Sequence, residues 1–405
     1  MRIAFISNEY ATESSFTGGL AQYARRTAEA LVAFGHHVEV FVWSDRDQTL
    51  EHNGVTVHRV SGILGPWFRI GTRLSRGAMR QPAFILAMNE RVRQRFLSVH
   101  RTEPFDIIQS HSVWAPTVTA LRQTRVPVVT RVSSYQPLWS EAYRRKRSFQ
   151  LWCRERLEVM QMRSSDAVYA PSRLVAKAIQ DCEGLAVEVI EPPVYLEEAL
   201  TDPSLALRLR RKGKYILFVG TLGRMKGADV LAKSLCRVFH QEREVHAVFA
   251  GADLGLDGKP AWPQIQETLG AGARRAVYLG KVPHGQLYPV IANAAVVALP
   301  SRIDNLPNAC LEAMALGAVV VGTRGASFDE VITHGRNGFL VPREDDAALA
   351  RALFHVLQLP SETRRQIGSA ARSTLRHMTP ERSIPRLVDY YGRVMEHGSQ
   401  CASRS

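Results

Sequence analysis

Two acidic residues, Asp304 and Glu312, stand eight positions apart in the segment SRIDNLPNACLEAMALG. The turn between them consists of Asn305, Leu306, Pro307 and Asn308, and the pattern predicts a helix over 308–316. Carboxylates accept hydrogen bonds from sugar hydroxyls, while the free N–H groups of residues 306–309, at the helix start, are expected to face an anion such as a phosphate. The combination suits a compound that carries both groups, such as a nucleotide sugar. A capping aspartate and an ordinary helix glutamate are the simpler alternative.

A basic loop, GTLGRMKG at 220–227, follows a predicted strand and opens a predicted helix. Arg224 and Lys226 are expected beside the N-terminus of that helix, where a guanidinium and an ammonium together can hold a diphosphate. Thr221 belongs to the same loop. Two solvated surface cations are the alternative interpretation.

Two further candidates lie in the first half of the chain. Gly18 and Gly19 precede an amphipathic helix in FTGGLAQYARRTAEAL, and glycines there let the backbone approach an anion. His111 ends the run DIIQSH, where a neutral imidazole can hydrogen-bond a sugar hydroxyl. A plain loop and a histidine satisfied within the fold are the alternatives.

Other chemistries lack their motifs in this sequence. Neither GxxxxGK[ST] nor GxGxxG occurs, which argues against an ATPase and against ordinary NAD binding. Asp45-Arg46-Asp47 matches a metal-binding DxD, but a solvated loop without further ligands is expected there, so no metal site is predicted. The five cysteines show no CxxC spacing, which favours reduced, buried thiols over disulfides or zinc.

The elements that position these residues are predicted from short Val- and Ile-rich runs that alternate with segments of helical period. Strands are expected at 2–7, 37–43, 55–60, 106–110, 127–132, 166–170 and 187–191, then at 214–220, 245–250, 276–279, 295–299, 318–322 and 338–341. Helices are expected at 19–34, 81–99 and 380–396, among others. Near-continuous apolar strands separated by helices predict parallel sheets covered on both faces. Ligands collect at the carboxyl ends of such strands, where the candidate residues are expected.

The chain of 405 residues is too long for one compact core of usual size. Two prolines in IEPPVYLEEA interrupt the alternation, so a linker is placed near 192–200. We therefore predict an α/β protein of two doubly wound, Rossmann-like domains, 1–195 and 196–379. A C-terminal helical segment, 380–405, can pack on either domain, and packing back on the first is one hypothesis.

The formal net charge of +14 is concentrated in two segments, 59–101 and 144–163. Trp67, Phe68 and Trp152 are among the aromatic residues interleaved with these basic residues, which favours contact with anionic lipid; a solvated basic face is an equal alternative. Nucleic acid ranks lower because no recognition motif accompanies the charge. No signal peptide and no apolar run of about 20 residues is found. We expect a cytoplasmic protein, with peripheral attachment to the inner face of the plasma membrane as a hypothesis.

The assembled motifs resemble the large GT-B family of retaining glycosyltransferases numbered family 4, over nearly the whole length. In the first half the likeness rests on NEY, GGLAQYARRTAEAL, GHHVEVF and DIIQSH. In the second half it rests on FVGTLGRMKG, VFAGAD, VYLGKVPHGQLYPVIANA, LPSRIDNLPNACLEAMALGAVVVGT and DEVITHGRNGFLVP. Their shared order and spacing make the resemblance specific.

The resemblance implies an acceptor-side first domain and a second domain that binds a nucleotide diphosphate sugar, facing each other across a cleft. Asp304 and Glu312 match the family's acidic pair, expected at the donor sugar and the ribose. Lys226 matches the diphosphate lysine. The backbone at Lys281 and Val282 matches the nucleobase strip. Gly19 and His111 match the loop and the histidine that the first domain contributes.

Three positions depart from the family pattern. Asp304 replaces the usual glutamate and is one methylene shorter. Thr221 stands where the diphosphate arginine is expected, and Arg224 can replace it from the same loop. Ser133 stands where a histidine is often found.

These features predict a retaining glycosyltransferase that moves a sugar from a nucleotide diphosphate sugar to a hydroxyl acceptor, in cell-surface glycan or glycolipid synthesis. The resemblance implies that the leaving phosphate helps to deprotonate the acceptor and that no metal cofactor is needed. A lipid-linked glycan is a candidate acceptor. A nucleotide-sugar epimerase and a noncatalytic partner of a membrane polysaccharide assembly are the alternatives.

Overall fold

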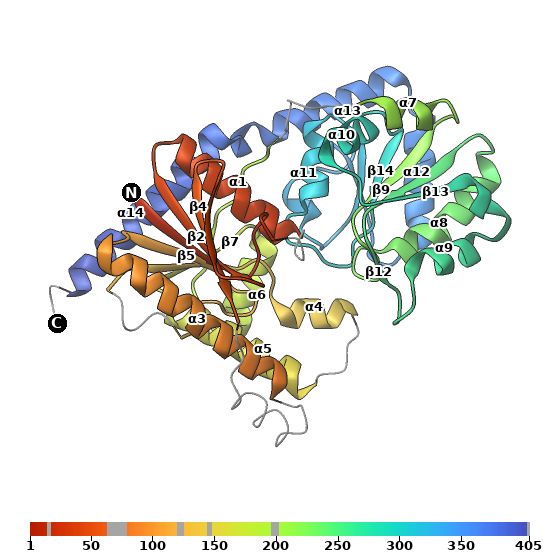
Figure 1. Ribbon diagram of the computed structural model, residues 1–405. Coiled ribbons are helices and arrows are strands. Elements are labelled where there is room, and N and C mark those ends of the chain that lie inside the picture. Colours follow the sequence, from red (N-terminus) through yellow and green to blue (C-terminus); the bar gives the residue numbers. More distant parts are fainter. Residues whose placement is uncertain (14–17, 63–78, 120–124, 144–147, 196–201, 403–405) are drawn as a thin grey trace. The chain divides into compact units, whose positions relative to one another are not determined.

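The computed structural model describes residues 1–13, 18–62, 79–119, 125–143, 148–195 and 202–402 (Figure 1). The chain forms two compact units, of which the first comprises Met1–Pro193 with Pro380–Ser405 and the second comprises Val194–Thr379. The chain thus leaves the first unit after Pro193, close to the expected boundary after residue 195, and returns to it at Pro380. Each unit is described by itself below.

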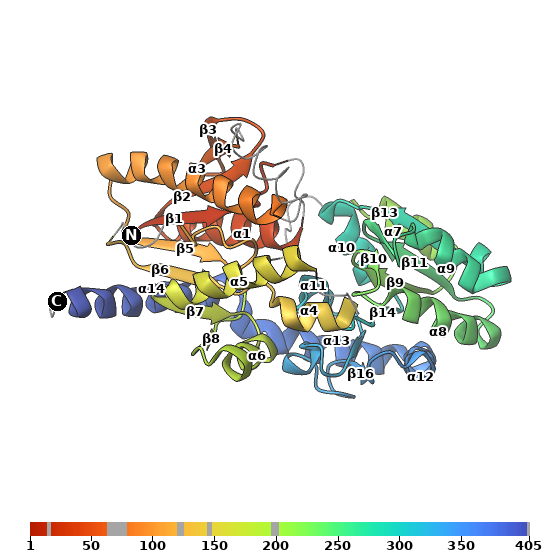
Figure 2. The ribbon, with the colours of Figure 1, turned by 90° about the horizontal axis from the view of Figure 1, so that it is seen from below.

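The first unit is built on a mainly parallel sheet with the strand order β3-β4-β2-β1-β5-β6-β7-β8. Figure 2 shows these strands stacked in that order, with β3 and β4 at the top. The strands are β1 (Arg2–Ser7), β2 (His37–Ser44), β3 (Gln48–His52), β4 (Val55–Ser61), β5 (Ile107–His111), β6 (Val128–Arg131), β7 (Ala167–Ala170) and β8 (Glu188–Val189). β3 pairs antiparallel with β4 and was not expected from the sequence. Its largely exposed residues lack the apolar signature because the strand lies at the edge of the sheet.

The first unit also contains several helices. They are α1 (Gly19–Ala33), α3 (Arg80–Thr102), α4 (Gln136–Tyr143), α5 (Phe149–Ser164), α6 (Arg173–Glu183) and α14 (Pro380–Ala402). Ile85, Val92 and Phe96 of α3 enter one core cluster with Phe41 and Trp43 of β2. Their spacing places them on one face of the helix, as the predicted helix at 81–99 requires.

The last helix, α14, belongs to the first unit and contacts α1. Tyr390 of α14 meets Tyr169 of β7 edge to face, with ring centroids 5.6 Å apart. Arg393 pairs with Glu188 of β8 at 2.7 Å. Buried aromatic contacts therefore attach this helix, far along the chain, to the sheet of the first unit.

The second unit has a parallel sheet with the order β13-β11-β9-β14-β15-β16 and a separate pair, β10 with β12. The strands are β9 (Tyr215–Val219), β10 (Leu222–Gly223), β11 (His246–Ala250), β12 (Asp253–Gly255), β13 (Ala276–Gly280), β14 (Val296–Leu299), β15 (Val320–Thr323) and β16 (Phe339–Val341). The helices are α7 (Ser204–Arg210), α8 (Ala228–Gln241), α9 (Ala261–Leu269), α10 (His284–Ala292), α11 (Asn308–Ala315), α12 (Asp346–Gln358) and α13 (Ser361–Thr374). Two large apolar clusters lie against this sheet, as a doubly wound domain requires.

The thiols are less uniformly buried than expected. Cys310 is buried and Cys153 is half-buried, but Cys182 and Cys236 are exposed. Both exposed cysteines lie on helices, where Val175 and Ile179 of α6 and Leu235 and Val238 of α8 are buried while the cysteines lie on the exposed side.

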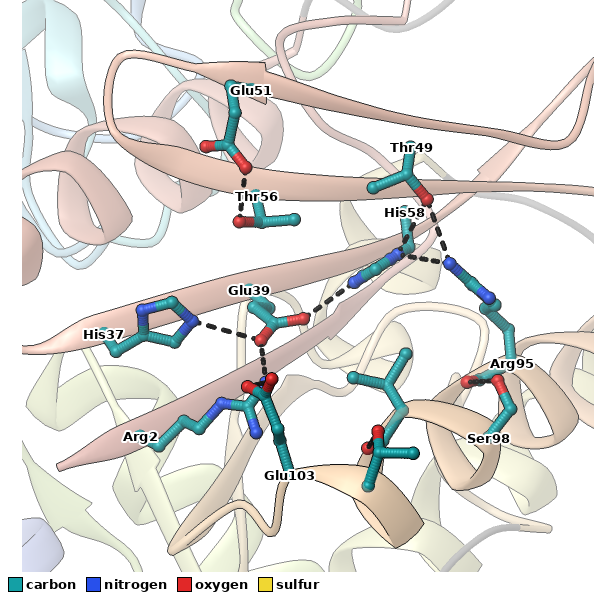
Figure 3. Close-up of polar contacts among 12 residues, drawn as sticks. Arg2, His37, Glu39, Thr49, Glu51, Thr56, His58, Arg95, Ser98 and Glu103 are labelled. Carbon is teal, nitrogen blue, oxygen red and sulfur yellow. Dashed lines mark hydrogen bonds and ion pairs between the residues drawn. The ribbon is translucent and has the colours of Figure 1, made fainter.

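A buried charge network ties β1, β2 and β4 together in the first unit. Figure 3 shows Glu39 between Arg2, His37 and His58. His58 donates from Nε2 to Glu39 at 2.7 Å, and its Nδ1 lies 3.1 Å from both Thr49 and Arg95. Burial alone raises the pKa of Glu39, but hydrogen bonds from His58, Arg2 and His37 lower it to about 2.

Candidate functional site

In the second unit, the loops that follow β9 and β14 meet because these two strands pair directly. The backbone N–H of Arg302 donates to the carbonyl of Met225 at 2.8 Å, which joins the two loops. Gly227 has a φ of 70°, and a Cβ atom there would lie 2.0 Å from the carbonyl oxygen of Pro300. Only glycine permits this close approach, so the sequence GRMKG has a structural reason for its last residue.

Lys226 and Asp304 form the central contact of this site. The Lys226 ammonium lies 2.6 Å from Asp304 Oδ2, and Ser301 donates to the same oxygen at 3.2 Å. Asp304 is 9% exposed, whereas a quarter of the Lys226 side chain remains accessible. The two residues are 78 positions apart in the chain, so tertiary structure brings together two residues that were predicted separately.

Arg302 anchors both loops and was not singled out from the sequence. It donates twice to Asp229 of α8, at 2.8 and 2.7 Å, and once to Glu344 at 2.6 Å. Arg224 lies 3.8 Å from Glu344 and is half-buried, so it is not the freely solvated cation of the alternative interpretation. The sequence did offer a signal for Arg302, because Ser301 and Arg302 stand between the end of β14 and Asp304.

The helix α11 begins at Asn308, as predicted, but its cap differs from the prediction. Pro307 occupies the N-cap position in an extended conformation, and no side chain caps the helix, so Asn305 does not play that part. Leu306 is left-handed with a φ of 55°, and its N–H donates to Ser327 Oγ at 2.9 Å. The Leu306 amide, expected to face an anion, is therefore already used within the fold.

The remaining predicted donor-binding residues of this unit have distinct surroundings. Glu312 is buried on α11, and its Oε1 lies 3.8 Å from His284 Nε2. Lys281 follows β13 and is exposed, whereas Val282 packs against a core cluster. Thr221 is half-buried between β9 and β10. These residues lie at or beyond carboxyl strand ends, except Glu312, which α11 carries.

In the first unit, His111 ends β5 and is buried beside β1. Its Nε2 lies 3.0 Å from Ser7 Oγ and 3.3 Å from the N–H of Asn8. Burial and the nearby Arg131 guanidinium lower the pKa of His111 to about 3. The imidazole is therefore neutral near pH 7, which suits a hydrogen-bond role and not that of a cation.

Gly18 and Gly19 stand at the start of α1, as expected. Gly18 is the N-cap and no side chain caps the helix. A Cβ atom on Gly18 would lie 3.4 Å from the carboxylate of Glu9, whose pKa is raised by burial. Gly18 therefore stands beside a half-buried carboxylate at the end of β1.

Arg131 at the end of β6 is a further candidate. Its guanidinium lies 3.7 Å from the ring centroid of Tyr23 and donates to Ser133 at 2.7 Å. Among the described residues, Nε of this buried arginine has no hydrogen-bond partner and no carboxylate forms an ion pair with it. Ser133, one of the departures from the family pattern, thus contacts the neighbouring cation.

The DxD segment has a structural role where it is described. Asp45 pairs with Arg46 and Arg59, and Asp47 accepts from the N–H of Ser61 and pairs with Arg91. Within the described ranges, no group of three His, Cys, Asp or Glu side chains is placed to hold a metal ion.

Parts of the two basic segments, including Trp67, Phe68 and residues 144–147, lie outside the described residues. In the portion that is described, no helix is both long and apolar enough to cross a bilayer.

Comparison with known proteins matches both halves of the chain. Residues 17–198 match the family described as Glycosyltransferase Family 4, and residues 213–359 match Glycosyl transferases group 1. D-inositol 3-phosphate glycosyltransferase of Corynebacterium urealyticum is 25% identical, with 96% of this chain and 95% of that protein covered. The protein of the same name from an Arthrobacter species is 28% identical, with coverages of 91% and 90%.

Solved structures agree on the fold. Sucrose-phosphate synthase from Thermosynechococcus elongatus superposes with a TM-score of 0.76 at 20% identity, over 98% of this chain and 99% of that one. Anabaena HepE in complex with UDP and glucose superposes with a TM-score of 0.72 at 17% identity, over 97% and 100%. The predicted GT-B fold is confirmed.

Proposed function

The chain is a GT-B glycosyltransferase composed of a family 4 domain and a group 1 domain, and we propose that it uses a nucleotide diphosphate sugar as donor, with retention of anomeric configuration. The observation that carries the proposal is the 2.6 Å contact between Lys226 and Asp304 at the carboxyl ends of the second sheet. A cation for phosphate and a carboxylate for a sugar hydroxyl stand side by side there. HepE, of the same fold, has been solved with UDP-glucose.

In the proposed reaction, the bond between the anomeric carbon and the diphosphate oxygen breaks and a bond to the acceptor oxygen forms on the same face. The acceptor proton passes to the leaving phosphate. Lys226, Arg224 and the first N–H groups of α11, at Asn308, would stabilise the charge that grows on the diphosphate. Glu312 would hold the ribose, and Lys281 and Val282 would border the base. Because these groups supply cationic and dipolar stabilisation, we propose that no metal is needed, and transfer should continue in EDTA.

We further propose an acceptor that carries a phosphate, in cell-surface glycan or glycolipid synthesis. Arg131 supports this proposal as a buried cation without a carboxylate partner in the described part of the chain, next to His111. Several relatives are named for D-inositol 3-phosphate, and a lipid-linked glycan also carries phosphate. His111, as a neutral imidazole, would hydrogen-bond an acceptor or donor hydroxyl.

The test begins with a thermal-shift screen against UDP, GDP and ADP and their common sugar conjugates, without added metal. A selective rise in melting temperature identifies the donor, because a ligand that binds only the folded state stabilises it. Transfer from that donor is then measured with inositol phosphate and with a lipid-linked phosphosugar. Release of free nucleotide without any acceptor would favour the epimerase alternative, and donor binding without turnover would favour the noncatalytic one.

A further inference from the structure

Helix α5 of the first unit buries charged and polar side chains and exposes large apolar ones. Its buried face carries Glu155, Glu158 and Gln161 beside Leu151, Val159 and Met162, while Phe149, Trp152 and Met160 are exposed by 54%, 46% and 51%. In a water-exposed helix, charged side chains face the solvent and large apolar ones face the core. Both glutamates belong to the basic segment 144–163, and the structure buries them.

The buried polar face of α5 is satisfied by specific contacts. Gln161 donates to the carbonyl of His111 at 2.9 Å and accepts from the N–H of Thr117 at 2.8 Å. Glu158 accepts from the N–H of Trp114 at 3.1 Å, and burial raises the pKa of Glu158 to about 7. The inner face of α5 therefore holds the loop that follows β5, where His111 lies. These contacts explain why Glu158 and Gln161 are buried. They do not explain why Phe149, Trp152 and Met160 are exposed.

The outward face of α5 forms one continuous stripe. It consists of Phe149, Trp152, Arg156, Met160 and Arg163, spaced three or four residues apart and all exposed. Phe149 stacks on Trp152 with ring centroids 6.0 Å apart, and the Arg156 guanidinium lies 5.8 Å from the Trp152 ring. Since Glu155 and Glu158 point inward, every charged residue of this stripe is basic.

The neighbouring helix α3 extends this surface. Helices α3 and α5 are in contact, and a groove of about 490 Å³ runs between them. Met79 and Leu86 border it on the α3 side and are 41% and 39% exposed, and Trp152, Cys153 and Met160 border it on the α5 side. Apolar side chains that stay exposed together on two packed helices mark a surface that another apolar body covers.

We propose that this surface, the stripe of α5 with the groove beside α3, docks the first unit on an anionic lipid bilayer. Aromatic and thioether side chains would enter the interfacial layer while Arg156 meets lipid phosphates. Arg163 already pairs with Glu183 at 3.3 Å. Charge decides against a second copy of this chain, because a symmetric contact would oppose two arginine-bearing stripes in a chain of net charge +14. Docking would also bring the His111 loop, on the inner side of α5, close to a lipid-linked acceptor.

The test is cosedimentation of the full chain with phosphatidylcholine vesicles, with and without phosphatidylglycerol. The wild type should bind the anionic vesicles at about 0.05 M salt and release at about 0.5 M. The Phe149→Ala, Trp152→Ala, Met160→Ala triple variant should bind about tenfold more weakly or worse. Leu207→Ala with Leu254→Ala, which truncates two apolar residues of the second unit that are 52% and 71% exposed, is the control and should bind normally.

Arg156→Glu should likewise weaken anionic-vesicle binding several-fold, whereas Arg274→Glu, an exposed arginine of the second unit, should not. Absence of wild-type binding at low salt, or a triple variant that binds as well as the wild type, would overturn the proposal. So would a wild-type dimer that the triple variant abolishes, since the occupant would then be a second copy. The thermal shift with donor nucleotide should be the same in every variant. The docking surface and the proposed donor chemistry are therefore tested independently of each other.

Discussion

Two carboxylates, Glu39 in the first unit and Asp304 in the second, each contact basic groups, yet their settings differ. The partners of Glu39 come from strands β1, β2 and β4, which the sheet holds rigidly (Figure 3). Asp304 meets Lys226 between two loops beyond the carboxyl ends of strands. Lys226 remains partly accessible, so a ligand phosphate can compete for it. A charge pair within a sheet serves stability, whereas a similar pair at the strand ends is available for binding.

The largest expected effect is on the loop pair. Lys226→Ala should lower the transfer rate by about 10²- to 10³-fold, because it removes a cation that stabilises the leaving diphosphate. The melting temperature should change little, since partly exposed ion pairs contribute about 1 kcal/mol or less. Steady-state kinetics and a melting curve check both parts. Lys233→Ala, an exposed lysine on α8, is the control, and equal rates for the two variants would remove Lys226 from the donor site.

Substitution of Glu39 in the sheet should lower stability and leave the transfer rate unchanged, the opposite of the result expected at Lys226. Glu39→Gln should lower the free energy of unfolding by about 3 kcal/mol, because Arg2 and His58 then lose a buried carboxylate partner. The rate per folded molecule should be unchanged. Denaturant titration measures the difference, with Glu51→Gln, an exposed glutamate that accepts from Thr56 nearby, as control.

The contribution of Glu39 to the free energy of unfolding should depend on pH. The pKa of Glu39 is about 2 in the folded state and about 4.3 in an unfolded chain. Its stabilising contribution is therefore complete above about pH 4.5 and is lost as the pH falls towards 2. The stability gap between wild type and Glu39→Gln should shrink over that window. A gap that stays constant to about pH 3 would contradict the assigned pKa.

A smaller effect is expected at His111. His111→Asn should slow transfer by about tenfold, the size of one neutral hydrogen bond to substrate. Because the pKa of His111 is about 3, the pH profile of kcat/KM between about pH 5.5 and 8 should contain no ionisation that disappears in the variant. A profile with such an ionisation near pH 6.5 would show that His111 titrates during turnover.

The smallest effect should follow Asp304→Glu, which restores the family's usual residue. The charge is kept and one methylene is added, so the rate should fall by less than about tenfold while the preference among donor sugars shifts. Competition between two sugar conjugates of the same nucleotide measures this shift. Unchanged preference would place Asp304 away from the donor sugar.

The sequence by itself determined the class of fold and most of the residue types that do chemistry. The helix predicted at 81–99 is observed as Arg80–Thr102, and the strand predicted at 214–220 as Tyr215–Val219. These elements could be predicted because period and apolarity are local properties of the chain. Lys226 and Asp304 were recognisable for the same reason, since each lies beside a strand end that the sequence already marks.

Only the tertiary structure decided which of these groups meet and which are already used. The contact between Lys226 and Asp304 joins residues 78 positions apart, and Ser327 takes the Leu306 amide that was expected to be free. The burial of Glu158 on α5 could not be predicted either, because its partner, the N–H of Trp114 in the loop after β5, is distant in sequence. Partners distant in sequence set the burial and hydrogen bonding of a side chain, and local pattern carries no information about them.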